Sequence, residues 1–154
     1  MSTPRATLLG ELEEEVATIA RRARRAVADR ARLVAPDLSP TAYLCLVVLR
    51  DRAGDCAQQQ VADALGLDKG VVSRAVDELE GHGLVRRTPD PADGRRHRLV
   101  LTEDARDRLA AVDGQRRARY AERLAGWSTA DLARAARLLR AYNDALGDGL
   151  GSEG

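Results

Sequence analysis

Residues 65–102 read LGLDKGVVSRAVDELEGHGLVRRTPDPADGRRHRLVLT, and this stretch decides the fold. Its apolar residues between Val72 and Leu79 recur at the three- and four-residue spacing of one helix face. This spacing predicts a helix that begins after an Asp68 cap and runs to His82.

The pattern changes at Gly83, which stands where a left-handed residue ends the helix. Residues 84–87 and 97–101 are short and compatible with strands, and the segment PDPADG (89–94) between them marks a tight reversal. The sequence therefore predicts a two-stranded β hairpin with a protruding tip.

Upstream, a short helix is predicted over 58–65, closed by Gly66. Two short helices joined by a turn that contains glycine, then a hairpin, form the plan of a winged helix-turn-helix, here over residues 39–102. In that plan the second helix enters the major groove of DNA with its first turns. The candidate DNA contacts on the two helices are Gln58, Lys69, Ser73 and Arg74.

The predicted recognition helix, over residues 69–82, has a polar and basic first half and an acidic second half. Arg74 can make a bidentate contact to a guanine edge or hold a phosphate, and Ser73 can donate to either. Asp77, Glu78 and Glu80 follow, and because phosphate repels them we expect only the first half to enter the groove. The alternative is an ordinary amphipathic helix with a charged outer face.

The hairpin carries the stronger charge signal. It holds five arginines, which are Arg86, Arg87, Arg95, Arg96 and Arg98. Arg95 near the tip suits a narrow minor groove, and Asp93 is placed to orient its guanidinium. Arg86, Asp93, Arg95 and Arg96 therefore join the candidate DNA contacts, against the alternative of an exposed basic turn without a partner.

The flanking segments are predicted to be helical. A long helix is expected over 8–34, a second begins at Ser39-Pro40, and Thr102 caps a third that extends to about Gly126. A capping box at Ser128 opens the last helix, which ends near Leu146, and 147–154 is expected to be a flexible tail. The apolar faces of the helices predicted over 8–34 and 103–146 have no evident partner inside so small a lobe. We therefore interpret these segments as dimerisation helices of a single domain, 1–154.

Composition bounds the remaining possibilities. Apolar residues make up 44% of the chain and aromatic residues only 3%, with no Phe, which favours a mainly α protein. The net charge of +1 is too small for a protein that coats nucleic acid through its overall charge. No metal-ligand spacing, nucleophile–base pair or phosphate loop is present, so neither an enzyme nor a cofactor is expected. No membrane span or signal-like run is found, so a cytoplasmic location is expected.

These residues together resemble the MarR family of bacterial transcriptional regulators, over Leu12 to Leu146. The matching motifs are Ser73-Arg74, Leu79-Glu80, Gly83-Leu84-Val85, Asp93 with Arg95, Leu101-Thr102, and the segments LSPTAYLCLVVL (38–49) and GWSTADLARAARLLRAYNDAL (126–146). The resemblance implies a homodimer whose recognition helices lie about 34 Å apart on a palindromic operator. It also implies a repressor released by a small aromatic or anionic ligand, or by thiol oxidation.

The chain departs from the family at three positions. Ala57 stands where family members often have Ser or Thr, and Gly70 and Val71 replace polar residues that are common at the start of the recognition helix. DNA binding is still expected, but the family's base preferences are not carried over to this chain.

Regulation leaves several alternatives open. A ligand is expected in a cleft between the first, second and fifth helices, with Tyr43 and Cys45 as candidate contacts. A thiol sensor would use Cys45 or Cys56, and the helix start at Cys56 is a place where the dipole lowers a thiol's pKa. A winged-helix module that binds protein instead of DNA is the remaining alternative.

Overall fold

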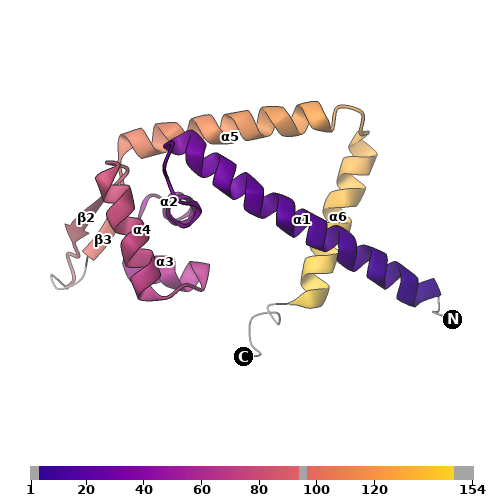
Figure 1. The fold of residues 1–154 in the computed structure, drawn as a ribbon, viewed down its shortest axis with the longest axis horizontal. Coiled ribbons are helices and arrows are strands. Elements are labelled where there is room, and N and C mark those ends of the chain that lie inside the picture. The colour runs from indigo at the N-terminus through magenta and orange to yellow at the C-terminus, as the bar shows by residue number, and fades with distance from the viewer. Residues whose placement is uncertain (1–3, 94–96, 148–154) are drawn as a thin grey trace. The chain divides into compact units, whose positions relative to one another are not determined.

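The computed structural model describes residues 4–93 and 97–147, and the chain divides into two compact units, residues 1–113 and 114–154. Figure 1 labels the elements, which in chain order are α1 (Pro4–Val34), α2 (Pro40–Asp51), β1 (Asp55–Ala57), α3 (Gln58–Leu65), α4 (Lys69–Gly81), β2 (Val85–Pro89), β3 (His97–Leu101), α5 (Glu103–Arg123) and α6 (Thr129–Leu146). The predicted class, mainly α with a winged helix-turn-helix, is confirmed.

The sheet has one strand more than the hairpin that we predicted. Three antiparallel strands lie in the order β1-β3-β2, and Cys56 of β1 pairs with Leu99 of β3 while Val85 of β2 pairs with Leu101. A strand of three residues is too short to show alternation in a sequence. It exists because β3 offers it an edge to pair with.

Most helix ends follow the predictions, but α1 begins at Pro4, earlier than the predicted residue 8. The Ser39 hydroxyl accepts from the Ala42 N–H (3.1 Å), and the Thr102 hydroxyl accepts from the Ala105 N–H (3.2 Å). Asp68 occupies the N-cap position of α4, but its side chain makes no cap hydrogen bond. Helix α5 ends at Arg123, short of the predicted Gly126.

Gly83 ends α4 as expected. Its φ is +67°, and the Leu84 N–H returns to the Leu79 carbonyl (2.9 Å), which satisfies the end of the helix. The Thr102 hydroxyl donates to the Gly83 carbonyl (2.9 Å). The end of α4 and the start of α5 are therefore joined by one side chain.

The core lies in the first unit, where α1, α3, α4 and β3 all pack against α2. The predicted inward face of α4 is confirmed, since Val72, Val76 and Leu79 are fully buried. The first part of α5 completes the core through Ala105, Leu109 and Val112. This packing fixes the position of α4 relative to the strands.

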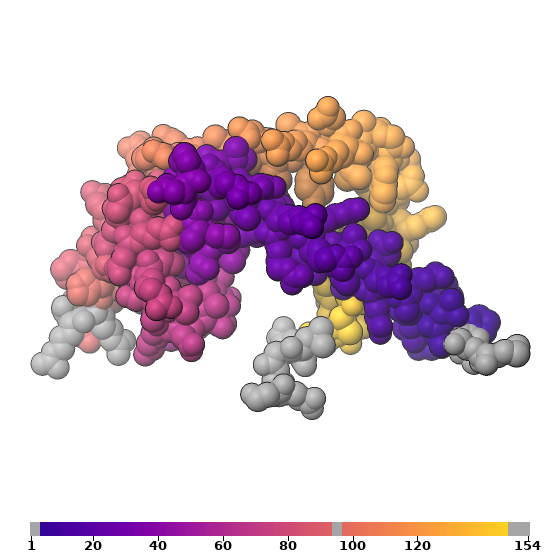
Figure 2. Space-filling model, viewed as in Figure 1, coloured from indigo at the N-terminus to yellow at the C-terminus, as the bar shows by residue number. Residues whose placement is uncertain are grey.

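Exposed leucine and isoleucine side chains gather on α1 and α6. Figure 2 shows the N-terminal half of α1, in indigo, extending clear of α2–α4. Leu8, Leu9, Leu12 and Ile19 on that half are between 45% and 63% exposed. In the second unit, α6 has no buried residue, and Leu132, Leu138, Leu139 and Leu146 are exposed.

Two further sequence predictions are not tested by the described residues. Residues 148–154 of the predicted tail lie outside them, so its flexibility stays a prediction, as do the predicted domain boundaries. Among the helices in the described part of the chain, none is long and apolar enough to cross a membrane.

Candidate nucleic-acid interface

The first half of α4 presents a polar outer face. Gly70, Ser73 and Arg74 are three and four residues apart and so share one side of the helix. Arg74 and Lys69 are exposed and Ser73 is half-buried. Since Val72 and Val76 fill the core on the other side, these polar groups point away from the body of the lobe.

Glu78 in the second half of α4 holds the helix to α2. Its two carboxylate oxygens accept from the Ser39 backbone N–H (2.6 Å) and from the Ser39 hydroxyl (2.7 Å). A carboxylate that receives two hydrogen bonds in this way is fixed in place. Glu78 thus supports the helix instead of facing a DNA phosphate.

Asp77 and Glu80 hold the wing to the same helix. Arg87 of β2 donates to the Asp77 carboxylate (2.7 Å) and to Glu80, and its backbone N–H also reaches the Glu80 carboxylate (3.1 Å). The Arg87 side chain is only 25% exposed. The expected repulsion between these acids and DNA is therefore reduced, because Arg87 offsets one of their two negative charges.

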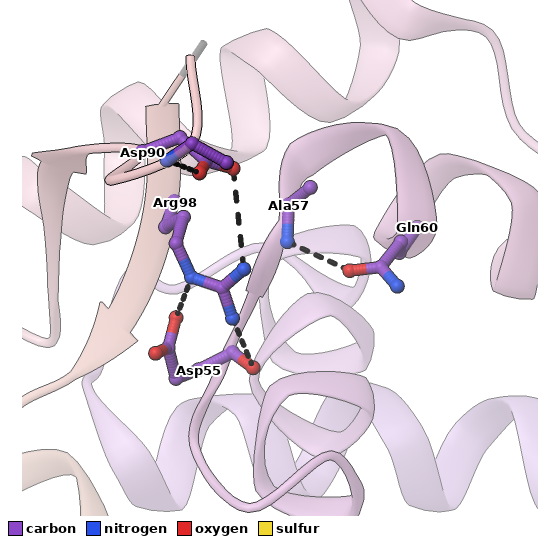
Figure 3. Close-up of polar contacts among 6 residues, drawn as sticks. Asp55, Ala57, Gln60, Asp90 and Arg98 are labelled. Atoms are coloured by element: carbon purple, nitrogen blue, oxygen red, sulfur yellow. Dashed lines mark hydrogen bonds and ion pairs between the residues drawn. The ribbon is translucent and has the colours of Figure 1, made fainter. Parts of the chain in front are cut away.

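Arg98 makes a second charged connection, near the tip end of the paired wing strands, where it lies opposite Thr88. Figure 3 shows its guanidinium between Asp55 and Asp90, with Nε donating to Asp55 Oδ1 (2.8 Å) and Nη1 lying 4.0 Å from Asp90 Oδ2. The hydrogen bond that Arg98 donates to Asp55, together with the negative charge of that carboxylate, raises the pKa of Arg98 above the ordinary arginine value. Asp90 also accepts from the Ala92 N–H (2.8 Å), so the same group shapes the turn that begins the wing tip.

The five wing arginines therefore do not act alike. Arg87 and Arg98, which the sequence did not place among the candidate DNA contacts, form ion pairs with acidic residues of the same chain. Arg86 is exposed and has no ion pair within the described chain. Arg95 and Arg96, and with them the predicted contact from Asp93 to Arg95, lie outside the described residues, while Asp93 itself is exposed.

Ala57 leaves the start of α3 without a hydroxyl cap, as the sequence indicated. The Gln60 side chain accepts from the Ala57 N–H instead (2.9 Å), which is also drawn in Figure 3. Gln58 is the first residue of α3 and is half-buried. Its role as a DNA contact stays a prediction.

Tyr43 and both cysteines belong to the core. Tyr43 is 3% exposed, Cys45 is fully buried and Cys56 is 2% exposed. Burial raises the pKa of the Cys45 thiol to about 11. Burial also raises the pKa of Cys56, although Arg52 opposes the shift. The predicted lowering of the Cys56 pKa is wrong, because desolvation outweighs the helix start.

Sequence reasoning missed the internal roles of the acidic residues. Asp77 and Glu80 are three residues apart, so they lie on the same side of α4 and both face Arg87. Their spacing in the sequence could have indicated this shared face. Asp55 and Arg98 are 43 residues apart, and no local pattern links them. No group of three or more His, Cys, Asp or Glu in residues 4–93 and 97–147 is arranged to hold a metal ion.

A helix that presents polar groups outward, followed by a basic wing fixed to it, defines a winged helix-turn-helix protein of the DNA-binding class. The chain belongs to the MarR family of transcription regulators. The family model described as "MarR family" matches residues 37–96. The HTH-type transcriptional regulator YxaD of Bacillus subtilis (strain 168), itself described as uncharacterized, is 31% identical over 137 residues, which cover 89% of this chain and 94% of YxaD.

Solved structures agree on the fold. A crystallised MarR family transcription regulator superposes with a TM-score of 0.81 at 20% identity, covering 97% of each chain. The apo form of MarR from E. coli gives a TM-score of 0.67 at 21% identity, covering 85% of this chain and 95% of that one. The family model and the similarity to YxaD confirm the family assignment that we made from sequence motifs, and the family is one of regulators, a class that is generally not enzymatic.

Proposed function

We propose that this protein reads a specific DNA sequence with the first half of α4 and represses transcription from it. The division of α4 carries the proposal. Its acidic second half is bound to Ser39 and Arg87, whereas Lys69, Ser73 and Arg74 in its first half face outward. A helix built in this way offers DNA hydrogen-bond donors and positive charge at the end that enters the groove.

Each candidate contact has its own role in this proposal. Arg74 reads a guanine edge with support from Ser73, and Lys69 and Arg86 bind phosphates on either side. Gln58, the first residue of α3, contacts the DNA backbone. The sequence pattern alone supports the wing-tip residues: Arg95 and Arg96 bind in the minor groove, and Asp93 orients the Arg95 guanidinium.

We propose further that the protein acts as a homodimer on a palindromic operator. Apolar residues exposed on α1 and α6 support this, because a helix such as α6 without any buried residue gains its stability from packing against something else. Equilibrium sedimentation should give twice the monomer mass. A Leu139→Glu variant should shift the equilibrium toward monomer, while the exposed Arg137→Ala should not.

Release by a small aromatic or anionic molecule is the regulation that the family resemblance implies. Tyr43 and Cys45 are buried in the core here, so such a molecule would need other contacts or a rearranged lobe to meet them. The thiol alternative is weakened by the burial and raised pKa of Cys45 and Cys56, since the thiolate is the reactive form. Neither mode replaces DNA binding as the main function.

The test is selection of binding sites from a random duplex pool, followed by titration of the selected duplex at increasing salt. A specific regulator should select one palindromic motif, with log affinity falling by about 0.9 per phosphate contact for each tenfold rise in salt. Arg74→Ala should relax the selected motif, and Arg86→Ala should weaken binding to all sequences and reduce the slope by about 1. Selection of no motif, with binding that does not respond to salt, would instead favour a protein-binding module.

A further inference from the structure

Gly70 is a glycine that the fold does not require. It is exposed, its φ is not positive, and a Cβ built on it would meet no atom within 4 Å. Glycine weakens a helix relative to alanine, because it exposes backbone and costs entropy. Packing within the lobe therefore does not require glycine at this position, which lies on the face that carries Ser73 and Arg74.

Val71 is the second residue that packing leaves unexplained. It is half-buried, yet among the described residues the partly buried side chains that pack on the core nearby are Leu65 and Leu67, and Val71 is outside that set. It stands three residues before Arg74, so its methyl groups border the outward face. The first turn of α4 thus offers a gap at Gly70 with an apolar group beside it.

We propose that Gly70 and Val71 are specificity-determining residues that read a thymine. The missing side chain at Gly70 lets the first turn of α4 approach a base edge closely, and Val71 packs against the 5-methyl group of a thymine there. Thymine is the base that presents a methyl group in the major groove, so this contact separates it from the other three bases. The inference rests on the proposed function, since it needs α4 in the groove.

The first experiment compares two glycines of the same helix. Gly81 is exposed at the last position of α4, and a Cβ on it would also meet nothing within 4 Å. Gly70→Ala and Gly81→Ala should both melt at temperatures at least as high as the wild type, with a gain of up to about 4 °C. Gly70→Ala should bind the duplex selected by the wild-type protein at least about tenfold more weakly, whereas Gly81→Ala should bind it equally well. Equal binding by both variants would overturn the role of Gly70.

The second experiment removes single methyl groups from the DNA. Each thymine of the selected duplex is replaced by uracil in turn, which leaves its pairing unchanged. At one position in each half-site the wild type should lose about fourfold in affinity, the factor expected for one buried methyl group. Val71→Ala should bind the uracil and thymine duplexes equally. A motif without any uracil-sensitive position, or a sensitive position that persists in Val71→Ala, would overturn the contact while leaving the proposed function intact; the absence of any selected motif would overturn both.

Discussion

Arg98 and Asp55 join the wing to the strand that precedes the helix-turn-helix. The Arg98 Nε donates to Asp55 Oδ1 over 2.8 Å, and its Nη2 lies 3.5 Å from the Asp55 carbonyl. Asp90, at the start of the wing tip, lies on the other side of the same guanidinium. The Arg98 side chain therefore connects β3 and the wing tip to β1. Strand β1 leads directly into α3, whose first residue, Gln58, is a candidate DNA contact.

This relationship predicts that Arg98 positions the wing without binding DNA. Arg98→Ala should weaken binding to the selected duplex about three- to tenfold, while the salt slope stays unchanged because no phosphate contact is lost. The Arg98 and Asp55 side chains are partly buried (32% and 48% exposed), and an ion pair that still reaches solvent adds little to stability, so the melting temperature should fall only slightly. Arg32→Ala, which breaks an exposed pair with Asp29 on α1, is the matched control and should bind normally. A slope reduced by about 1 in Arg98→Ala would identify Arg98 as a phosphate contact instead.

Arg87 is predicted to contribute to the stability of the fold. Arg87→Met should lower the free energy of unfolding by about 1–3 kcal/mol, because the half-buried Glu80 loses its charged donor. Urea unfolding at several protein concentrations measures this for a dimer. Arg86→Ala, one residue away and exposed, should stay within about 0.5 kcal/mol. Equal stabilities for the two variants would contradict the connection between wing and helix.

Gly54 is predicted to be less replaceable than Gly66. Both have positive φ, +79° and +62°, but a Cβ at Gly54 would lie 2.6 Å from Arg106 Nη2, and at Gly66 it would meet nothing. Arg106 also donates from Nη1 to the Leu101 carbonyl (2.9 Å), a bond that a displaced side chain would lose. Gly66→Ala should cost about 1 kcal/mol through backbone strain. Gly54→Ala should cost about 1 kcal/mol more.

A double-mutant cycle separates strain from displacement at Gly54. In an Arg106→Ala background the obstacle is gone, so Gly54→Ala should then cost no more than Gly66→Ala. If the extra cost remains in that background, displacement of Arg106 is not its cause.

The buried Cys45 thiol should make the free energy of unfolding decrease at alkaline pH. Burial raises its pKa in the folded protein to about 11, above its ordinary value near 9.0, so the folded state holds the proton more tightly than the unfolded state. The stabilising contribution is complete below pH 9 and is lost as the pH rises from about 9 to about 11, by at most about 1.4 kcal/mol for each pH unit. The free energy of unfolding at pH 8 and pH 10 should therefore fall more in the wild type than in Cys45→Ala. Parallel pH profiles would contradict the shift.

Local features of this protein could be predicted from the sequence alone. The caps at Ser39, Thr102 and Ser128 and the end of α4 at Gly83 act within four residues of themselves, and the structure has all of them. The buried face of α4 follows from helical periodicity in the same way. The family motifs that combine these features were enough to identify the class of protein.

The tertiary structure decided what depends on residues far apart in the chain. Strand β1 forms because β3 lies beside it, Arg98 is compensated by an acid 43 residues away, and Cys56 is desolvated by the core despite its place before a helix. Periodicity and capping are interactions between neighbours in sequence, and they are present in any chain with that pattern. Ion pairs across elements, edge pairing and burial exist only after packing has brought distant residues together, so only the folded chain determines which arginines of the wing remain available for DNA.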